Sequence, residues 1–403
     1  MVKWNQFNVD WEDRIDYHRL RKERVEKLRK EMKKNNFDAM LVTKSETVRF
    51  ITGMRHIHNY AFYVCRYLAL LPLNGDPILG VPSGGYVSAK QRMSWIKDVR
   101  ALPMAFDDRF VAKESANDIL KPMFEAAGVT EGRVGIDILP LCVIESLKNA
   151  LPKIELVDGY DALYWAKAIK TEDEINVLRI ANEIAGAGVE TAIELIKPGV
   201  RECEIVAEVA KKMYELGAED FPYTPQIISG EHSAPYYMGI PTEKIIRYGD
   251  HIFMDIGAIF NGYNSDIARC YVLGRATEEQ KKYYKAVYQT LQTATELSKD
   301  GALGSEVVKA ARKVIIDAGL EKDMYFGMLV HGIGTMSQEI PVIGERVVAE
   351  KREVTLKEGM VLCYEPGIFK PGLGGFRIEN SVAVRKDRGE TLTHVRYAED
   401  LLD

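Results

Sequence analysis

The chain has 403 residues, of which 46% are hydrophobic, and its 54 basic and 59 acidic residues give a net charge of −5. This length suits about two or three domains with sizeable cores, and the charge excludes the basic footprint of a nucleic-acid-binding protein. The five cysteines are scattered without a CxxC pair, and no apolar run resembles a signal peptide or a membrane span. We therefore expect a cytoplasmic protein with no membrane contact.

The first 165 residues alternate predicted strands with predicted helices. After an irregular arm, a helix with Val25, Leu28 and Met32 on one stripe precedes a buried strand over residues 38–43. Further strands are predicted at residues 63–73, 77–81, 133–138 and 154–157, and helices at residues 115–127 and 141–150. This alternation predicts an α/β domain with a mixed sheet, although it does not give the order of the strands.

Residues 170–403 carry signs of an internal duplication. Thr171 with Glu174, and Thr277 with Gln280, form capping boxes that each open a long helix. When the chain is shifted by 102 residues, the segment 194–217 falls on 296–319 without a gap, and eight of the 24 positions are identical. We predict two helix–helix–strand halves related by a pseudo-twofold axis, with strands from both halves lining one site.

The segment 253–271 is predicted to form a β-hairpin. Asn261-Gly262 suits a two-residue turn, because both turn residues need positive φ. This turn sets Asp255 opposite Ala268 and puts Asp255 and Asp266 on one face, with Cα atoms about 7–8 Å apart. An acidic hairpin facing water is the alternative, but the flanks are too apolar for it. Two carboxylates held this closely repel each other, and two divalent ions about 3.5–4 Å apart would suit the space between them.

Three more candidate ligands follow in apolar β segments. His331 lies beside glycines in HGIG, Glu365 ends the strand before a Pro-Gly turn, and Glu379 lies within an apolar strand over residues 376–384. A lone histidine of this kind is more often structural, whereas glutamate is seldom placed in such a strand unless it is paired or metal-bound. Together with the two aspartates they supply four carboxylates and a neutral imidazole, which balance two divalent cations. Oxygen-rich ligation of this kind favours Mn²⁺, Fe²⁺, Co²⁺ or Zn²⁺.

The motifs MDIG, GYNSDIAR, HGIG, YEPG and RIEN, in this order, resemble those of the pita-bread metallopeptidases. That family includes prolidase, aminopeptidase P and methionine aminopeptidase, and the non-peptidase creatinase shares its fold. The resemblance covers nearly the whole chain and implies an α+β, two-domain protein that forms a homodimer. Residues 1–165 would be a creatinase/prolidase-type α/β domain, and residues 170–403 a pseudo-twofold pita-bread catalytic domain.

The resemblance also implies roles for the five candidate ligands. Asp255 would chelate one metal ion, Asp266 and Glu379 would bridge both ions, and His331 and Glu365 would complete the second. The implied activity is that of a dinuclear metallohydrolase resembling Xaa-Pro dipeptidase and aminopeptidase P. It would use a metal-bridging hydroxide, with Glu365 as proton shuttle, on a dipeptide or another small molecule.

The sequence departs from the peptidase pattern at two positions. The two non-ligand histidines of the peptidases are replaced here by Met238 and Gln338. Methionine donates no hydrogen bond, and glutamine donates one but cannot titrate. Tyr237 could supply a hydroxyl or an aromatic wall that attracts a cationic group. The candidate substrate-binding residues are Tyr237, Met238, Gln338 and Arg377.

This departure leaves two alternatives to a peptidase. One is a metal-dependent non-peptidase of the same fold, for example a dimethylsulfoniopropionate-lyase-like enzyme that acts on a small onium compound. The interval of eleven residues between the two aspartates differs from that of those lyases. The other is a binding protein without catalysis, which the complete ligand set and the lack of a basic tail disfavour.

Overall fold

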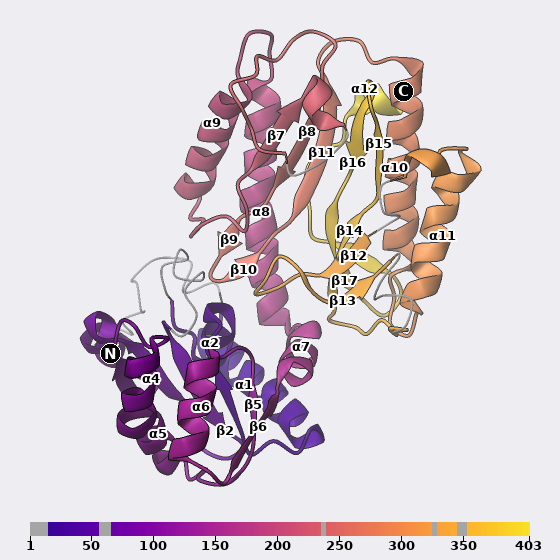
Figure 1. The fold of residues 1–403 in the computed structure, drawn as a ribbon. Coiled ribbons are helices and arrows are strands. Elements are labelled where there is room, and N and C mark those ends of the chain that lie inside the picture. Colours follow the sequence, from indigo (N-terminus) through magenta and orange to yellow (C-terminus); the bar gives the residue numbers. More distant parts are fainter. Residues whose placement is uncertain (1–14, 56–65, 235–238, 325–328, 345–352) are drawn as a thin grey trace. The chain divides into compact units, whose positions relative to one another are not determined.

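The computed structural model describes residues 15–55, 66–234, 239–324, 329–344 and 353–403. The chain divides into two compact units, residues 1–167 and residues 168–403 (Figure 1). Within the described ranges, no helix is long and apolar enough to cross a bilayer.

The N-terminal unit is built on a six-stranded mixed sheet in the order β4-β3-β2-β1-β5-β6. The strands are β1 (Ala39–Val42), β2 (Leu68–Pro72), β3 (Ile78–Pro82), β4 (Asp98–Leu102), β5 (Gly132–Ile136) and β6 (Ile154–Asp158). Strand β2 runs antiparallel to both neighbours and the other pairs are parallel, which confirms the predicted mixed sheet. The sequence did not reveal β4, because this edge strand carries polar residues at Asp98 and Arg100.

Seven helices of this unit are described: α1 (Tyr17–Lys34), α2 (Ser45–Thr52), α3 (Tyr86–Arg92), α4 (Arg109–Ser115), α5 (Lys121–Ala126), α6 (Leu141–Ala150) and α7 (Tyr160–Ala168). A π-helical turn (Ala116–Leu120) joins α4 to α5, so the helix predicted at residues 115–127 starts earlier than expected.

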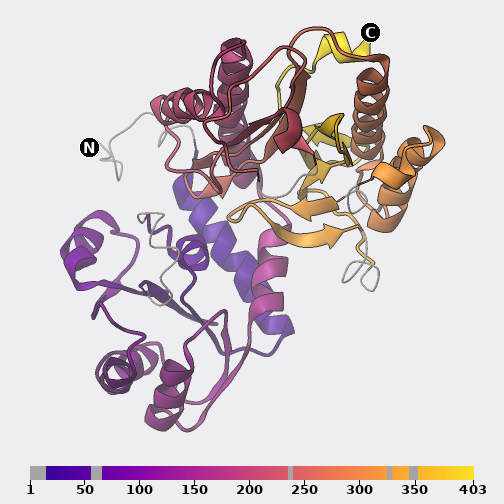
Figure 2. The same ribbon diagram turned by 45° about the horizontal axis from the view of Figure 1, so that its top comes forward.

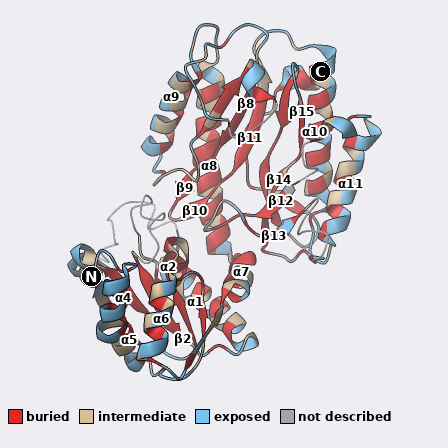
Figure 3. Cartoon of the chain, viewed as in Figure 1, coloured by how far each residue is buried: buried red, intermediate tan, exposed pale blue. Residues whose placement is uncertain are grey.

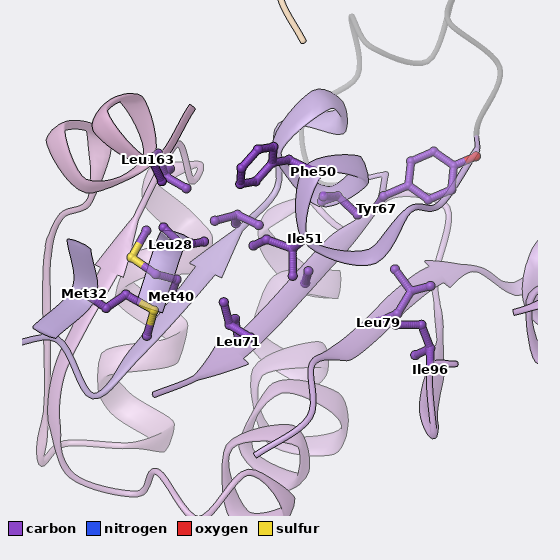
Figure 4. Packing of buried hydrophobic residues seen from close by; sticks show 14 of the residues in the cluster. Leu28, Met32, Met40, Phe50, Ile51, Tyr67, Leu71, Leu79, Ile96 and Leu163 are labelled. Atoms are coloured by element: carbon purple, nitrogen blue, oxygen red, sulfur yellow. The ribbon is translucent and has the colours of Figure 1, made fainter. Parts of the chain in front are cut away.

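The sheet of the N-terminal unit separates two apolar cores. Side chains alternate between the faces of a strand, and β1 accordingly sends Met40 and Val42 into one core and Ala39 and Leu41 into the other. The first core packs α1, α2 and α7 against the sheet (Figure 4). The second core packs the helical segment 109–126 and α6 against the opposite face.

The C-terminal unit contains the same arrangement twice. The first half has helices α8 (Glu172–Leu195) and α9 (Glu202–Glu215), then an antiparallel sheet of β7 (Gln226–Ser229), β8 (His251–Ile256) and β11 (Ile267–Val272). The second half has α10 (Glu278–Leu297) and α11 (Gly304–Asp317), then β12 (Leu329–Gly332), β14 (Val361–Glu365) and β17 (Asn380–Val384).

A short hairpin interrupts each half between its last two strands. The hairpins are β9 (Ile259–Phe260) with β10 (Tyr263–Asn264), and β15 (Gly367–Lys370) with β16 (Gly374–Arg377). Strands β13 (Glu339–Ile343) and β18 (Gly389–Thr391) extend the second sheet at its two edges, and α12 (Glu399–Leu402) ends the chain. The helix pairs lie outside the strands in both views (Figures 1 and 2), and the strands between them are buried (Figure 3).

Matching backbone bonds confirm the predicted two-half architecture. The amide of Gly199 donates to the carbonyl of Ile246 at 3.0 Å, and the amide of Gly301 donates to Leu356 at 2.9 Å. Both glycines lie between the two helices of their half and have positive φ, 93° and 81°. Both long helices also begin with the predicted capping boxes.

The predicted hairpin is confirmed in its turn and in its register. Asn261 and Gly262 have φ of 47° and 76°, which is the left-handed pair that a two-residue turn requires. Phe260 pairs with Tyr263, and Asp255 pairs with Ala268.

Candidate metal centre

Four carboxylates come from matching places in the two halves. Asp255 lies near the end of β8 and Glu365 ends β14, whereas Asp266 and Glu379 stand immediately before β11 and β17. Asp255, Asp266 and Glu379 are buried, Glu379 with only 1% exposure, and the side chain of Glu365 is 9% exposed.

The prediction that residues 376–384 form one strand is wrong. Strand β16 ends at Arg377 after pairing with β15, and β17 starts at Asn380 to pair with β14. The chain changes partner at Ile378 and Glu379, which therefore lie outside the ladder. The amide of Glu379 instead donates to the carbonyl of Ala268 at 3.0 Å, and this bond ties the second half to the first beside the carboxylates.

His331 completes the group of candidate ligands from β12. Its Nε2 lies 3.4 Å from Oε1 of Glu365 and 3.9 Å from carboxylate oxygens of both Asp266 and Glu379. Its Nδ1 lies 3.0 Å from the carbonyl of Gly332 and donates to it, which leaves Nε2 as the nitrogen that faces the carboxylates. The structure therefore brings a ring nitrogen that can bind a metal ion against three acidic side chains.

The donor atoms of this group fit a metal ion. Nε2 of His331, Oε1 of Glu365 and both carboxylate oxygens of Glu379 are buried, and among the described residues they have no hydrogen-bond partner. Buried polar atoms in proteins are nearly always hydrogen-bonded, so several unpartnered acceptors in one place fit a bound cation.

Arg377 neutralises part of this negative charge. Its guanidinium contacts the carboxylate of Asp255, lies 3.1 Å from Oε2 of Glu365 and lies 3.4 Å from Oε2 of Glu379. The contact between the guanidinium of Arg377 and Oε2 of Glu379 is an ion pair without hydrogen-bond geometry. Four carboxylates outnumber the one guanidinium, so once ionised they carry enough negative charge to bind divalent cations.

The pKa values of the acidic groups respond to this crowding. Burial, followed by the charge of Asp255, raises the pKa of Asp266 from 3.8 to about 8. Burial and the charge of Asp266 also raise the pKa of Glu379 well above its usual value. Burial alone would raise the pKa of Glu365, but Arg377 and His331 hold it below its usual value. Glu365 is thus more readily ionised than Asp266 and Glu379.

Two further residues of the site were not predicted from the sequence. The hydroxyl of Tyr223 donates to Oδ1 of Asp255 at 2.6 Å and also contacts Asp266. The thiol of Cys363 belongs to a cluster with Asp266, His331 and Glu379 whose ligand atoms all lie within 4.8 Å of one another. Tyr223 lies 32 residues before Asp255 in a loop, so no spacing rule linked them. Cys363 is directly opposite His331 in the ladder, which register could have shown.

The structure describes two of the four candidate substrate-binding residues. Tyr237 and Met238 lie outside the described residues. Gln338 is exposed on the segment that joins β12 to β13, and Arg377 lies on the ligand carboxylates as described above.

A duplicated α+β unit around a buried carboxylate and histidine cluster, with an α/β unit before it, defines the class of pita-bread metallopeptidases. The chain belongs to metallopeptidase family M24: residues 176–386 match that family, and residues 24–168 match the creatinase/prolidase N-terminal domain. Enzymes of this family are hydrolases that use divalent metal ions, and the predicted fold class and family are thereby confirmed.

Two kinds of relative agree with this assignment. An Xaa-Pro dipeptidase from Pyrococcus furiosus is 33% identical over 373 residues, which cover 92% of this chain and 98% of that protein. The crystal structure of the prolidase from Pyrococcus horikoshii OT3 aligns over 93% of this chain and 99% of its own, with a TM-score of 0.77 and 31% identity. An Xaa-Pro dipeptidase from Bacillus anthracis shares the fold at a TM-score of 0.78, with 24% identity.

Proposed function

We propose that the chain is a dinuclear dipeptidase that cleaves Xaa-Pro dipeptides or closely related small amides. The observation that carries the proposal is the convergence of four carboxylates and one imidazole, in which acceptor atoms of His331, Glu365 and Glu379 have no hydrogen-bond partner among the described residues. Relatives named Xaa-Pro dipeptidase, of nearly the same length, support the substrate class.

Five residues would hold the two ions. Asp255 would bind one ion, Asp266 and Glu379 would bind both, and His331 and Glu365 would complete the second. Mn²⁺, Fe²⁺, Co²⁺ and Zn²⁺ all suit oxygen ligands with a single imidazole. When bound, the ions would activate water for attack and polarise the carbonyl of the scissile amide.

Glu365 is proposed to take and return the proton. Because Arg377 and His331 keep the pKa of Glu365 below its usual value, the carboxylate is ionised at neutral pH and can accept a proton. The carboxylate of Glu365 has two oxygens, so one oxygen can bind an ion while the other receives the proton from water. The same atom would then protonate the leaving nitrogen.

The remaining residues are proposed to bind the substrate. Arg377 contacts the ligand carboxylates, and its planar guanidinium matches the carboxylate of a dipeptide in geometry and charge. Met238 and Gln338 stand where the peptidases have histidines, so we expect them to shape the pocket without exchanging protons. Tyr237 would add an aromatic wall. The proposal also includes the homodimer and the cytoplasmic location expected from the sequence.

The proposal is tested by reloading the metal-free protein with each of the four ions and assaying a panel of Xaa-Pro dipeptides. Matched Xaa-Ala dipeptides serve as the substrate control. Asp266→Asn serves as the protein control, because removing a carboxylate proposed to bind both ions should release metal and abolish turnover. A protein that binds two ions yet cleaves no dipeptide with any metal would refute the proposal. It would favour a non-peptidase reaction, for which onium-bearing small molecules are the next substrates to assay.

A further inference from the structure

A buried ion pair lies beside the strand of His331, since Glu339 pairs in the ladder with Gly332, the residue that follows this histidine. Nζ of Lys170 is 3.1 Å from Oε2 of Glu339, and both side chains are only 1% exposed. Lysine and glutamate are almost never fully buried unless they are paired. Such a pair contributes little net stability, because removing two charges from water offsets most of their attraction. Its role is therefore better sought in the conformation that it fixes.

The pair holds the segment Gly334–Gln338, which connects β12 to β13. Oε1 of Glu339 accepts a hydrogen bond from the hydroxyl of Thr335 at 2.9 Å and from the amide of Met336 at 3.1 Å. The carboxylate of Glu339, at the start of β13, is thus bonded to two residues of the segment that precedes it. Lys170 is fixed in turn, because its amide donates to the carbonyl of Gly359 at 2.8 Å.

The same segment is bonded to the strand that precedes Asp266. The carbonyl of Gly334 accepts two hydrogen bonds from Asn264, one from its backbone amide at 2.8 Å and one from its side chain at 3.0 Å. Asn264 lies two residues before Asp266, and Gly334 lies three residues after His331. The segment is therefore linked to the neighbours of two candidate ligands.

The fit around the ion pair leaves no room for a side chain at position 334. A Cβ added to Gly334 would lie 2.6 Å from Oε2 of Glu339 and 3.0 Å from Cε of Lys170. Such contacts are closer than packed atoms tolerate, so the backbone lies directly against the charged groups. The ion pair and the segment are thus packed as one unit.

We propose that Lys170 and Glu339 are positioning residues that hold the segment Gly334–Gln338 at the edge of the metal centre, where it presents Gln338 to the substrate. The part of this inference that concerns substrate rests on the proposed dipeptidase function. The part that concerns the conformation of the segment does not.

The conformational part is tested by amide hydrogen exchange of the metal-loaded protein. In Glu339→Gln and in Lys170→Met, we expect the amides of Gly334 and Met336 to exchange at least about tenfold faster than in the wild type. Amides in β8 should be unaffected. Unchanged exchange at Gly334 and Met336 in both variants would overturn the inference.

Milder variants keep the test decisive where a single charge removal prevents folding. Thr335→Val removes one bond to Glu339 and keeps the ion pair, so it should accelerate exchange in the same direction by a smaller factor. The double variant Lys170→Met with Glu339→Gln leaves no unpaired buried charge, and it should free the segment as fully as either single change. Lys244→Met is the matched control. It breaks a partly buried ion pair with Asp250, 2.9 Å between Nζ and Oδ2, in the other half and should leave the segment unchanged.

Kinetics separate a positioning role from support of the metal ligands. We expect Glu339→Gln to raise KM for a cleaved dipeptide about tenfold, with little change in kcat and an unchanged metal content. A fall in kcat together with lost metal would contradict the proposal, since the pair would then be supporting His331. A wild-type protein without dipeptidase activity would refute the proposed function. Hydrogen exchange needs no substrate, so it would still test whether the ion pair holds the segment.

Discussion

Asp255 and Glu365 occupy equivalent positions in the two halves of the C-terminal unit. Each lies on the middle strand of its sheet, and the partner of each is the first residue of the neighbouring strand: Gln226 for Asp255 and Leu329 for Glu365. The pseudo-twofold that relates the helices therefore also relates two of the candidate ligands.

The fifth candidate ligand has no counterpart. Two residues after Leu329 in β12, His331 pairs with Cys363. Two residues after Gln226 in β7, Ile228 pairs with Phe253. Ile228 is thus the equivalent of His331 in the first half. The duplication accounts for the carboxylates, and the histidine makes the two proposed metal positions chemically different.

Replacing His331 by the isoleucine found at the equivalent position of the first half should remove one ion from the metal centre. We expect His331→Ile to lower the metal content from two ions per chain to one, because the second ion would lose its only nitrogen ligand. The measurement is elemental analysis after dialysis against metal-free buffer. Ile228→Val is the control on the other half and should keep both ions. Two ions bound with unchanged affinity in His331→Ile would count against the assignment of this histidine.

Tyr223 is expected to act on metal affinity through the two aspartates. Its hydroxyl contacts both Asp255 and Asp266, and residues that orient ligands typically change metal affinity or activity about 10–100-fold when removed. We expect Tyr223→Phe to fold normally and to bind metal more weakly by about that factor, as measured by competition with a chelator. Tyr214→Phe, at a half-exposed ring, should bind metal like the wild type. Equal affinities in all three proteins would show that the hydroxyl has no part in the centre.

The metal-free protein should become less stable as pH rises. Asp266 has a pKa of about 8 when folded and an ordinary value of 3.8. Between these values the folded state holds a proton that the unfolded chain has lost, so the free energy of unfolding falls with rising pH. The raised pKa values of Glu379 and His331 act in the same direction. Glu365 acts oppositely, but its contribution is complete above its ordinary value of 4.5.

Urea unfolding of the metal-free protein at about pH 6 and about pH 8 measures this effect. We expect lower stability at the higher pH, and a smaller difference in Asp266→Asn, which lacks the titrating carboxyl. Added metal should reverse the trend, because ions compete with protons for these ligands and bind more tightly as pH rises. Equal stability of the metal-free wild type at both pH values would contradict the proposed protonation of the centre.

Local rules were enough to predict the parts of the site that depend on strand pairing. The turn at Asn261-Gly262 fixed the register of its hairpin, and that register placed Asp255 and Asp266 on one face. The capping boxes and the matched glycines likewise predicted the two halves, because each depends on residues close together in the chain.

Other features depend on contacts that the sequence does not encode locally. Tyr223 reaches the aspartates from a loop, and Lys170 reaches Glu339 across 169 residues. The break at Glu379 was missed because the apolar residues Phe376 and Ile378 before it and Val382 after it suit a strand equally well. Only the change of pairing partner, a tertiary property, interrupts the ladder there.

Arg269 provides the last prediction, because within the described part of the chain it joins the hairpin to Glu379 and Asn380 through carbonyl and amide oxygens, without a carboxylate. The side chain is fully buried, and its guanidinium donates to the carbonyls of Ala268 and Glu379 at 2.9 Å each. It also donates to the side chain of Asn380 at 3.0 Å, and it lies over the ring of Tyr397.

Replacing Arg269 should lower both the free energy of unfolding and the affinity for metal. Arg269→Met leaves several buried carbonyls unpaired, so we expect a loss of about 3–5 kcal/mol in the free energy of unfolding. Arg269→Lys keeps the charge but not the planar fork of donors, and it should lie between Met and the wild type. Urea unfolding measures the first effect, and metal content measures the second. Arg247→Met, at an exposed arginine, is the control and should change neither. A loss of stability without a loss of metal affinity would mean that Arg269 braces the fold alone. A loss of both would mean that the backbone of Glu379 needs this arginine to present its carboxylate.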